Sequence, residues 1–270
     1  MRSSSGMLID THAHLDYPDY DADRAEVIAR ATGAGVTEII SIGTRIDSST
    51  RAVELAENFP HIWATVGIHP SEADTAPDDV VERLRFLAQS PRVAAIGEIG
   101  LDYHHLPENR AEIAAYKERQ TQLFREQLDL TAELGLNAVI HQRDAWDDTL
   151  AILHGYTGRV RGVFHCFGGT LEQAREVLTL GHLVSFTGIV TFKNAKQVQA
   201  TARDVDASGF MVETDCPYLA PTPGRGKRCE PAHTRRVAEQ IAQLRGVSVD
   251  EISARTTQTA REFFKFHRSA

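Results

Sequence analysis

The sequence of 270 residues predicts a single (β/α)8 barrel, and three observations support this fold class. Short apolar runs rich in Val and Ile alternate with longer amphipathic stretches from end to end, which is typical of βα units around a parallel sheet. The length is common for a barrel that forms one domain. Histidines and carboxylates, which can bind metal ions or act as acids and bases, fall near the carboxyl ends of the apolar runs. Barrel enzymes carry their active sites on that face.

Eight apolar runs have the length and composition of strands buried on both faces. They are residues 8–15, 37–43, 62–69, 93–101, 137–142, 162–167, 183–189 and 210–215. Helices are expected between them, because apolar residues recur there at spacings of three and four. The clearest helices are 19–33, 111–134, 170–180 and 234–245, and a further helix, 247–266, closes the C-terminus. Residues 1–6 are expected to form a flexible extension of the one domain, 1–270.

An open, doubly wound sheet is the alternative arrangement of eight alternating strands. Such a sheet usually carries a GxGxxG turn after its first strand. Here the first strand ends in Asp10-Thr-His-Ala-His14 instead, and no linker or change of composition marks a second domain. The sequence therefore favours one barrel.

Composition and charge narrow the class of protein. With 42% hydrophobic and 24% charged residues, the composition is that of a soluble enzyme. No apolar run approaches the roughly 18 residues that span a bilayer, and residues 1–7 lack the apolar stretch of a signal peptide. A cytoplasmic protein is expected, with no membrane association and no obligate protein partner. The net charge of −8 argues against a broadly basic surface, yet a nuclease remains open, because bound cations supply positive charge locally.

The three cysteines give no sign of a structural role beyond packing. Cys166, Cys216 and Cys229 are odd in number and form no CxxC pair. A disulfide framework or a thiolate metal site is therefore not expected, and reduced packing thiols are.

Polar side chains interrupt the predicted strands near their carboxyl ends. They are His12, His14, His69, Glu98, Asp102, His141, His165, Glu213 and Asp215. Residues two apart on a strand point to the same side, so His12 and His14 both face the barrel interior. Two buried imidazoles need partners, and one metal ion serves both at once. A pair of hydrogen-bonded core histidines is the alternative.

The other polar residues each have an ordinary explanation when taken alone. Glu98 could be a solvated loop residue, His141 and His165 core histidines, and Asp215 a helix cap. Together with the first pair they make six candidate ligands, with nitrogen and oxygen donors that suit Zn, Mn, Fe or Ni, or Mg with fewer nitrogens. Six ligands exceed the tetrahedral set of one structural zinc. Two divalent ions that share a carboxylate are therefore expected.

Candidate substrate-binding residues lie on the same face. Residues 221–228 form a loop rich in Pro and Gly that carries Arg225, Lys227 and Arg228 directly beyond the last strand. A solubilising surface loop is the alternative, but beside a metal site we expect a phosphate clamp. His69 and His104 are candidates to donate to phosphate oxygens, and a structural role is equally open for each.

These residues occur in segments that resemble the TatD-type deoxyribonucleases, in family order and over nearly the whole chain. The matching segments are Asp10-Thr-His-Ala-His-Leu-Asp16, Val66-Gly-Ile-His-Pro70, Gly97-Glu-Ile-Gly-Leu-Asp-Tyr-His104, His141-Gln-Arg-Asp-Ala145, His165-Cys-Phe-Gly-Gly169, and Glu213-Thr-Asp-Cys-Pro-Tyr-Leu219 followed by Arg225-Gly-Lys227. Two positions depart from the family pattern. Cys229 stands where the family commonly has Asn, and Gly168 where it often has Thr.

The resemblance implies a TIM barrel with metal-dependent nuclease activity, often a 3′-to-5′ exonuclease action on DNA. The expected partner is thus a DNA substrate that is single-stranded or has a free 3′ end. One ion would use His12, His14, Glu98 and Asp215, and the second would share Glu98 with His141 and His165. Asp215 would also orient or deprotonate the attacking water, which makes it and Glu98 the expected catalytic residues. Mg²⁺ is the expected ion for activity, with Zn²⁺ or Mn²⁺ as alternatives.

Two rival functions use the same scaffold. The first is hydrolysis of another bond, as in amidohydrolases or in a deacylase acting on mischarged tRNA. Many binuclear amidohydrolases carry a carboxylated lysine at the end of the fourth strand, where this chain has Glu98, which favours the nuclease. The second is a non-catalytic binding protein, which the complete ligand set argues against.

Overall fold

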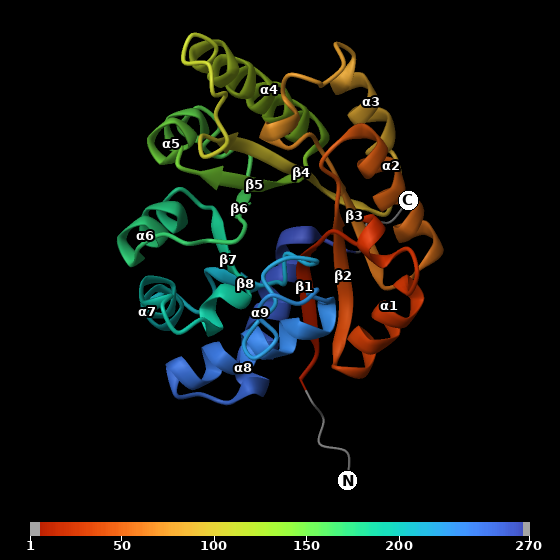
Figure 1. Ribbon diagram of the computed structural model, residues 1–270. Coiled ribbons are helices and arrows are strands. Elements are labelled where there is room, and N and C mark those ends of the chain that lie inside the picture. Colours follow the sequence, from red (N-terminus) through yellow and green to blue (C-terminus); the bar gives the residue numbers. More distant parts are fainter. Residues whose placement is uncertain (1–5, 267–270) are drawn as a thin grey trace.

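The computed structural model describes residues 6–266 as one parallel sheet of eight strands in sequential order, which confirms the predicted (β/α)8 barrel. Figure 1 views the barrel roughly along its axis, with the strands inside and the helices around them. The strands are β1 (Leu8–Ala13), β2 (Val36–Ile42), β3 (Ile62–Val66), β4 (Val93–Asp102), β5 (Asn137–Arg143), β6 (Gly162–Phe164), β7 (Leu183–Phe186) and β8 (Phe210–Val212). The expected flexible extension falls mainly on residues 1–5, which lie outside the described residues.

Helices connect each strand to the next and cover the sheet. They are α1 (Arg24–Gly33), α2 (Ile46–Asn58), α3 (Val80–Leu87), α4 (Ile113–Leu134), α5 (Trp146–His154), α6 (Leu171–Thr179), α7 (Lys196–Asp204), α8 (Thr234–Arg245) and α9 (Val249–Phe264). The five helices singled out from the sequence are all present. The first begins later than expected, because Pro18–Tyr20 forms a separate 3₁₀ turn, η1. The short helices α2, α3, α5 and α7 were not singled out.

Several helix ends are set by single residues. Thr170 and Gln173 form a capping box at the start of α6, in which each side chain bonds to the other's backbone N–H. Ser248 accepts a hydrogen bond from the backbone of Glu251 at the start of α9. The long helix α4 stops at Gly135, whose left-handed backbone (φ 61°) a side chain would disfavour.

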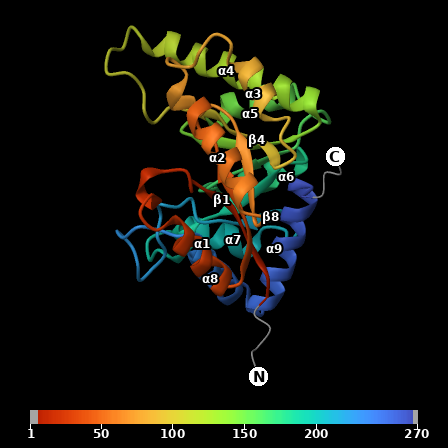
Figure 2. The same cartoon turned by 90° about the vertical axis from the view of Figure 1, so that its right-hand side faces the viewer.

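The base of the barrel is sealed by α9. Inward-facing apolar side chains near the amino ends of the strands form a cluster with Phe263, Phe264 and Phe266. Its strand members include Ile9, Ile40, Val139, Val163, Leu183 and Met211. Figure 2 shows α9 on the right of the molecule, while the loops that follow the strands project to the left. The base is therefore apolar and closed, and chemistry is confined to the opposite mouth.

The barrel closes where β8 returns to β1, through bonds concentrated near the mouth. The backbone N–H of His14 donates to the carbonyl of Cys216 at 2.8 Å, and that of Asp215 donates to His12 at 2.9 Å. Below them, the buried Asp10 carboxyl accepts from the N–H and the hydroxyl of Thr214 at 2.9 and 2.6 Å. Burial raises the pKa of Asp10 to about 8. This seam ties the first strand to the segment that carries the last candidate ligand.

Two further expectations concern thiols and membranes. Cys166, Cys216 and Cys229 are all free thiols, as expected. No helix within residues 6–266 combines the length and the apolar character required to cross a bilayer.

Replacing Phe264 by alanine should strongly destabilise the fold. Its ring is 1% exposed in the cluster at the barrel base, so the substitution leaves a cavity there. We expect the free energy of unfolding to fall by about 3–5 kcal/mol, measured by urea denaturation. Phe86 on α3 is the matched control, since it is 71% exposed and its replacement should change stability by less than about 0.5 kcal/mol. Equal effects at the two positions would contradict this account of the base.

Candidate metal centre

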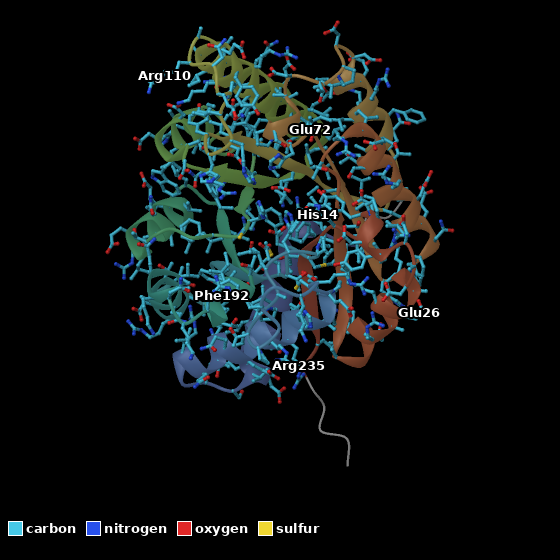
Figure 3. All side chains as sticks on the ribbon, in the orientation of Figure 1. His14, Glu26, Glu72, Arg110, Phe192 and Arg235 are labelled. Atoms are coloured by element: carbon cyan, nitrogen blue, oxygen red, sulfur yellow. The ribbon has the colours of Figure 1, made fainter. Side chains whose placement is uncertain are left out.

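The six candidate ligands come from strands distributed around the barrel and converge at its mouth. His12 lies in β1 and His14 just beyond it, Glu98 in β4, His141 in β5, His165 after β6 and Asp215 after β8. Figure 3 places His14 near the centre of the ring of strands. The sequence pattern suggested that Glu98 lies close to the end of its strand. In the structure β4 continues for four more residues, to Asp102. A shift of register between Ile96 and Ile99 accompanies this position.

The first group of ligand atoms surrounds a point between β1 and β8. The Nε2 atoms of His12 and His14 are 3.3 Å apart. Glu98 Oε2 lies 3.4 Å from the His12 nitrogen and 3.9 Å from that of His14. Asp215 Oδ1 lies 3.6 and 3.4 Å from the same two nitrogens. Two nitrogens and two oxygens thus face one another at similar separations.

Four of these five separations fit a divalent cation, and the fifth, between Glu98 and His14, is longer at 3.9 Å. An ion bound tetrahedrally at about 2.0–2.2 Å keeps its ligand atoms about 3.3–3.6 Å apart. The Nδ1 atoms of His12 and His14 are buried and have no hydrogen-bond partner within residues 6–266. If Nε2 of each ring binds an ion, the ring proton lies on Nδ1, and the partner that a ligand histidine usually has there is not found among residues 6–266.

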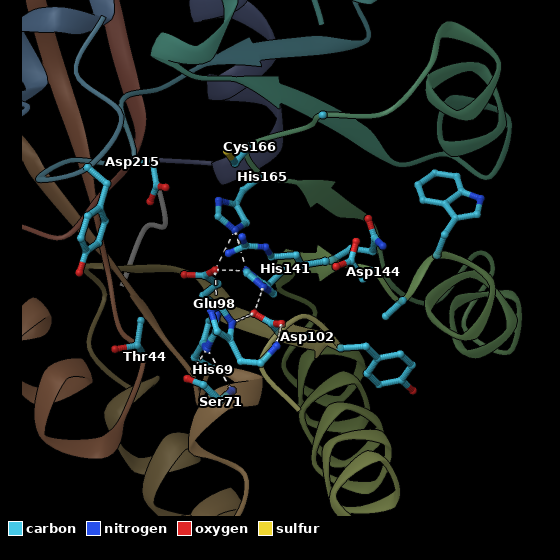
Figure 4. A pocket seen from close by; sticks show the side chains of 18 of the residues that line it. Thr44, His69, Ser71, Glu98, Asp102, His141, Asp144, His165, Cys166 and Asp215 are labelled. Atoms are coloured by element: carbon cyan, nitrogen blue, oxygen red, sulfur yellow. Dashed lines mark hydrogen bonds and ion pairs between the residues drawn. The ribbon is translucent and has the colours of Figure 1, made fainter. Parts of the chain in front are cut away.

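The second group lies on the other side of Glu98. Its Oε1 is 2.7 Å from His141 Nδ1 and 2.7 Å from His165 Nε2, and these two nitrogens are 3.1 Å apart. Figure 4 shows both contacts as dashed lines that meet at the carboxylate. The distances are those of direct hydrogen bonds, so this group is tighter than the first. Glu98 thus offers one oxygen to each group.

Charge in the centre is dominated by carboxylates that stay ionised. Burial alone would raise the pKa of Glu98, but the charge of His165 and hydrogen bonds with His12 and His141 hold it well below its usual value. Burial likewise opposes ionisation of Asp215, but a hydrogen bond from His14 and other histidine charges lower its pKa. Two anionic groups in a buried site favour the binding of cations.

Two further carboxylates lie behind the rings of the second group, and within residues 6–266 Asp102 alone hydrogen-bonds to its ring. Asp102 Oδ2 lies 3.2 Å from His141 Nε2 and 3.0 Å from His105 Nδ1. Despite burial, hydrogen bonds with Asp102 and Glu98 raise the pKa of His141 to about 9. Glu213, buried beneath the mouth, accepts from the backbone N–H of Cys166 at 2.7 Å and lies 3.8 Å from His165 Nδ1. A carboxylate behind a ligand histidine fixes the orientation of the ring.

The sequence placed Asp102 and Glu213 on the mouth but assigned them no role. A signal was present. Asp102 is four residues beyond Glu98 in one strand, and Glu213 is two residues before Asp215, so regular pleating would put each near a ligand.

His69 is positioned as a hydrogen-bond donor to the centre. Its Nδ1 accepts from the backbone N–H of Ser71 at 3.1 Å, so Nε2 carries the proton. This Nε2 lies 3.5 Å from Glu98 Oε1. Burial lowers the pKa of His69 to about 3, which keeps the ring neutral. The arrangement supports the expected role of His69 as a donor to a substrate oxygen.

His104 and Arg228, two other predicted substrate-binding residues, have partners away from the centre. The Nδ1 of His104 is 2.9 Å from the Asp144 carboxylate, and the ring is half exposed. The guanidinium of Arg228 binds both oxygens of Asp23 at 2.8 and 2.7 Å and Glu230 at 3.0 Å. This geometry favours a role for Arg228 in holding its loop against the start of α1.

A large open pocket surrounds the centre, with a cavity volume of about 1410 Å³. Small-molecule sites usually measure about 300–1000 Å³, so this pocket suits a larger substrate. Among the described residues, its lining includes the cations Arg45, Lys117 and Arg143. It includes none of Arg225, Lys227 and Arg228. Sequence reasoning missed the three lining cations because they are scattered over β2–α2, α4 and β5 and form no run.

Unusual backbone conformations also gather at this pocket. Of the five non-glycine residues with positive φ in the described chain, four line it, namely Asp144, Cys166, Asp215 and Leu219. Such conformations cost of order 1–3 kcal/mol each and are often found at functional sites. Asp215, with φ 57°, is held in place by the seam bond to His12.

Comparison with known sequences points to one family. A profile of the family described as TatD related DNase matches residues 9–265. The chain is 40% identical over 262 residues to the uncharacterized metal-dependent hydrolase YabD of Bacillus subtilis, across 97% of this chain and 100% of that protein. It is 35% identical over 264 residues to a Cronobacter sakazakii protein named 3′-5′ ssDNA/RNA exonuclease TatD, across 95% of this chain and 97% of that protein.

Solved structures agree with the sequence comparisons. The crystal structure of YJJV, a TatD homologue from Escherichia coli K12, matches with a TM-score of 0.88 at 30% identity, across 96% of this chain and 98% of that one. An uncharacterized amidohydrolase from Saccharomyces cerevisiae matches with a TM-score of 0.80 at 18% identity, across 96% and 99% of the two chains. The second likeness concerns the fold alone.

Glu98→Gln should abolish metal binding without unfolding the protein. The amide keeps the volume of the side chain but loses the charge and the second anionic oxygen. We expect affinity for divalent ions to fall by more than about 100-fold, because loss of an outer partner of a ligand alone costs roughly 10–100-fold. Mass spectrometry measures the metal content, and a thermal unfolding scan checks that the variant is still folded. Glu72→Gln, at the pocket wall but in neither group, is the control and should bind metal normally. Wild-type metal content in Glu98→Gln would remove Glu98 from the centre.

Proposed function

Because this chain belongs to the TatD related DNase family and is a metal-dependent hydrolase acting on ester bonds, we propose that it is a nuclease that removes nucleotides from the 3′ end of single-stranded DNA. One observation carries the proposal above the others. The two oxygens of Glu98 are divided between two groups of histidines, which is the arrangement expected of a carboxylate shared by two divalent ions.

The proposed ligand sets follow the two groups. His12, His14, Asp215 and Glu98 Oε2 would hold one ion, and Glu98 Oε1 with His141 and His165 the other. When bound, the ions supply positive charge for the phosphate oxygens and make a water molecule more acidic. Mg²⁺ is our expectation for activity, and the nitrogen-rich donor set keeps Zn²⁺ and Mn²⁺ as alternatives.

Side chains around the centre supply the remaining steps. Asp215 is anionic, and its carboxylate lies where it can accept a proton from the attacking water. The Nε2–H of His69 is available to a phosphate oxygen. Arg45, Lys117 and Arg143 lie on the pocket wall as candidate phosphate contacts. The same lining carries seven carboxylates, so most of the positive charge that attracts a polyanion would have to come from bound cations.

The choice of a single-stranded nucleic acid and of a 3′ end has its own support. A relative at 35% identity is named a 3′-5′ ssDNA/RNA exonuclease, and the pocket volume exceeds that of common small-molecule sites. Hydrolysis of an amide or of an aminoacyl-tRNA ester is the rival function, and the amidohydrolase likeness behind it concerns the fold alone.

Nuclease activity should depend on metal and proceed from one end. We expect end-labelled single-stranded DNA with Mg²⁺, Mn²⁺ or Zn²⁺ to give a ladder that shortens from the 3′ end, and a chelator to abolish it. Duplex DNA, RNA, a dipeptide amide and an aminoacyl-tRNA, followed in parallel, separate the rival functions. Full hydrolysis of DNA by metal-stripped protein, or turnover of the amide or aminoacyl ester alone, would overturn the proposal.

Arg143 should contribute more to DNA binding than the loop cations do. It is exposed on the pocket wall, whereas Arg225 stacks over Phe192 outside the lining. Arg143→Ala should raise the KM for single-stranded DNA. It should also reduce the slope of log affinity against log salt by about 1, because binding through one fewer phosphate contact releases fewer counterions. Arg225→Ala is the matched control and should leave both values near wild type. If Arg225→Ala weakens DNA binding and Arg143→Ala does not, the loop of Arg225 and Lys227 is the phosphate clamp after all.

A further inference from the structure

An exposed tyrosine stands beside the first ligand group. Three large hydrophobic side chains in the described part of the chain are more than half exposed, namely Met7, Phe86 and Tyr218. Of these, Tyr218 alone lines the pocket around the metal centre. It follows Asp215 by three residues, and its backbone N–H donates to the Asp215 carbonyl at 3.1 Å. The main chain that fixes a candidate metal ligand therefore also fixes this ring.

Three aromatic rings run outward from the first ligand group. The ring of Tyr17 stacks on His14, with 4.7 Å between centroids and 23° between planes. Tyr218 meets Tyr17 edge to face, at 6.3 Å and 81°, and its ring centroid is 6.5 Å from that of His14. Edge-to-face contact uses the rim of one ring and leaves ring surface open to another planar group. The Tyr218 hydroxyl makes no hydrogen bond to any other residue within 6–266, so the ring is not held by a polar contact elsewhere.

We propose that Tyr218, supported by Tyr17, binds the unpaired terminal nucleobase of the substrate by stacking. The inference rests on the proposed function and deepens it, since it names what the pocket recognises besides phosphate. Every base presents a flat aromatic face, so stacking on tyrosine is tolerant of sequence and raises affinity by about fivefold to more than a hundredfold per base. Leu219 and Ile189 line the same pocket and add apolar surface to it.

Two of the three lining cations, Lys117 and Arg143, lie across the pocket from the tyrosines, whereas Arg45 follows β2, the neighbour of β1. Lys117 and Arg143 come from α4 and β5, whereas Tyr17 and Tyr218 follow β1 and β8. In the sheet order these strands are separated by intervening strands on both sides of the ring. A strand end with its base on Tyr218 and its backbone toward the cations would lie across the metal centre. A paired terminus must first be opened before its base can reach the ring, so the site selects single-stranded or frayed ends.

Paired substrates test the proposal through turnover. Two single-stranded oligonucleotides differ only at the 3′ end, where one carries a normal nucleotide and the other an abasic one. We expect Tyr218→Ala to lower kcat/KM on the normal end by about tenfold, mainly through KM, and to leave the abasic end unchanged. Tyr218→Phe keeps the ring and should behave as wild type. Phe86→Ala, an exposed aromatic outside the pocket, is the matched control.

A second measurement needs no turnover. An oligonucleotide with 2-aminopurine at its 3′ end is added to Asp215→Asn protein, and fluorescence should fall when the base stacks. The same titration with Asp215→Asn/Tyr218→Ala should show little quenching. Equal loss of kcat/KM on both ends, or equal quenching with and without the ring, overturns the inference while wild-type cleavage leaves the proposed function standing. If wild-type protein cleaves neither oligonucleotide, the proposed function fails, and the quenching still decides whether Tyr218 binds a base.

Discussion

The mouth of the barrel depends on the contacts between the buried carboxylate of Glu98 and the histidines around it. An ionised carboxylate is costly to bury unless charges or hydrogen bonds compensate it, and here imidazoles reach it from β1, β5 and β6 as well as from the β3 loop. Only a closed barrel brings those strands around one point. Asp102 then hydrogen-bonds to His141 from behind, so the compensation extends outward by one layer there, while Glu213 lies 3.8 Å from His165 Nδ1.

The barrel separates two environments along its axis. Apolar side chains and α9 exclude water from the base, whereas the mouth collects imidazoles, carboxylates and strained backbone. The stability of the apolar half supports conformations such as the positive φ of Asp215, which would not persist in an isolated loop. The polar half can in turn remain open, because the fold does not rely on it for hydrophobic burial.

The sequence predicted what local pattern controls and missed what distant contacts decide. All eight strands and five helices followed from apolar periodicity, and the candidate ligands followed from polar residues near strand ends. The helices α3 and α7 are short and have few buried residues, so their pattern is weak. Arg228 looked like a phosphate ligand because its partner Asp23 lies 205 residues away in sequence. Arg143 and Lys117 were overlooked for the same reason, since only the fold brings them to one pocket.

The seam between β1 and β8 has a consequence for the chain during its synthesis. His12 and His14 emerge first from the ribosome and Asp215 among the last elements of the sheet, so the first ligand group joins the two ends of the barrel. A nascent chain that stops before residue 210 lacks β8, the seam and this group together. The first ligand group is thus absent from every chain that ends before β8 has been made.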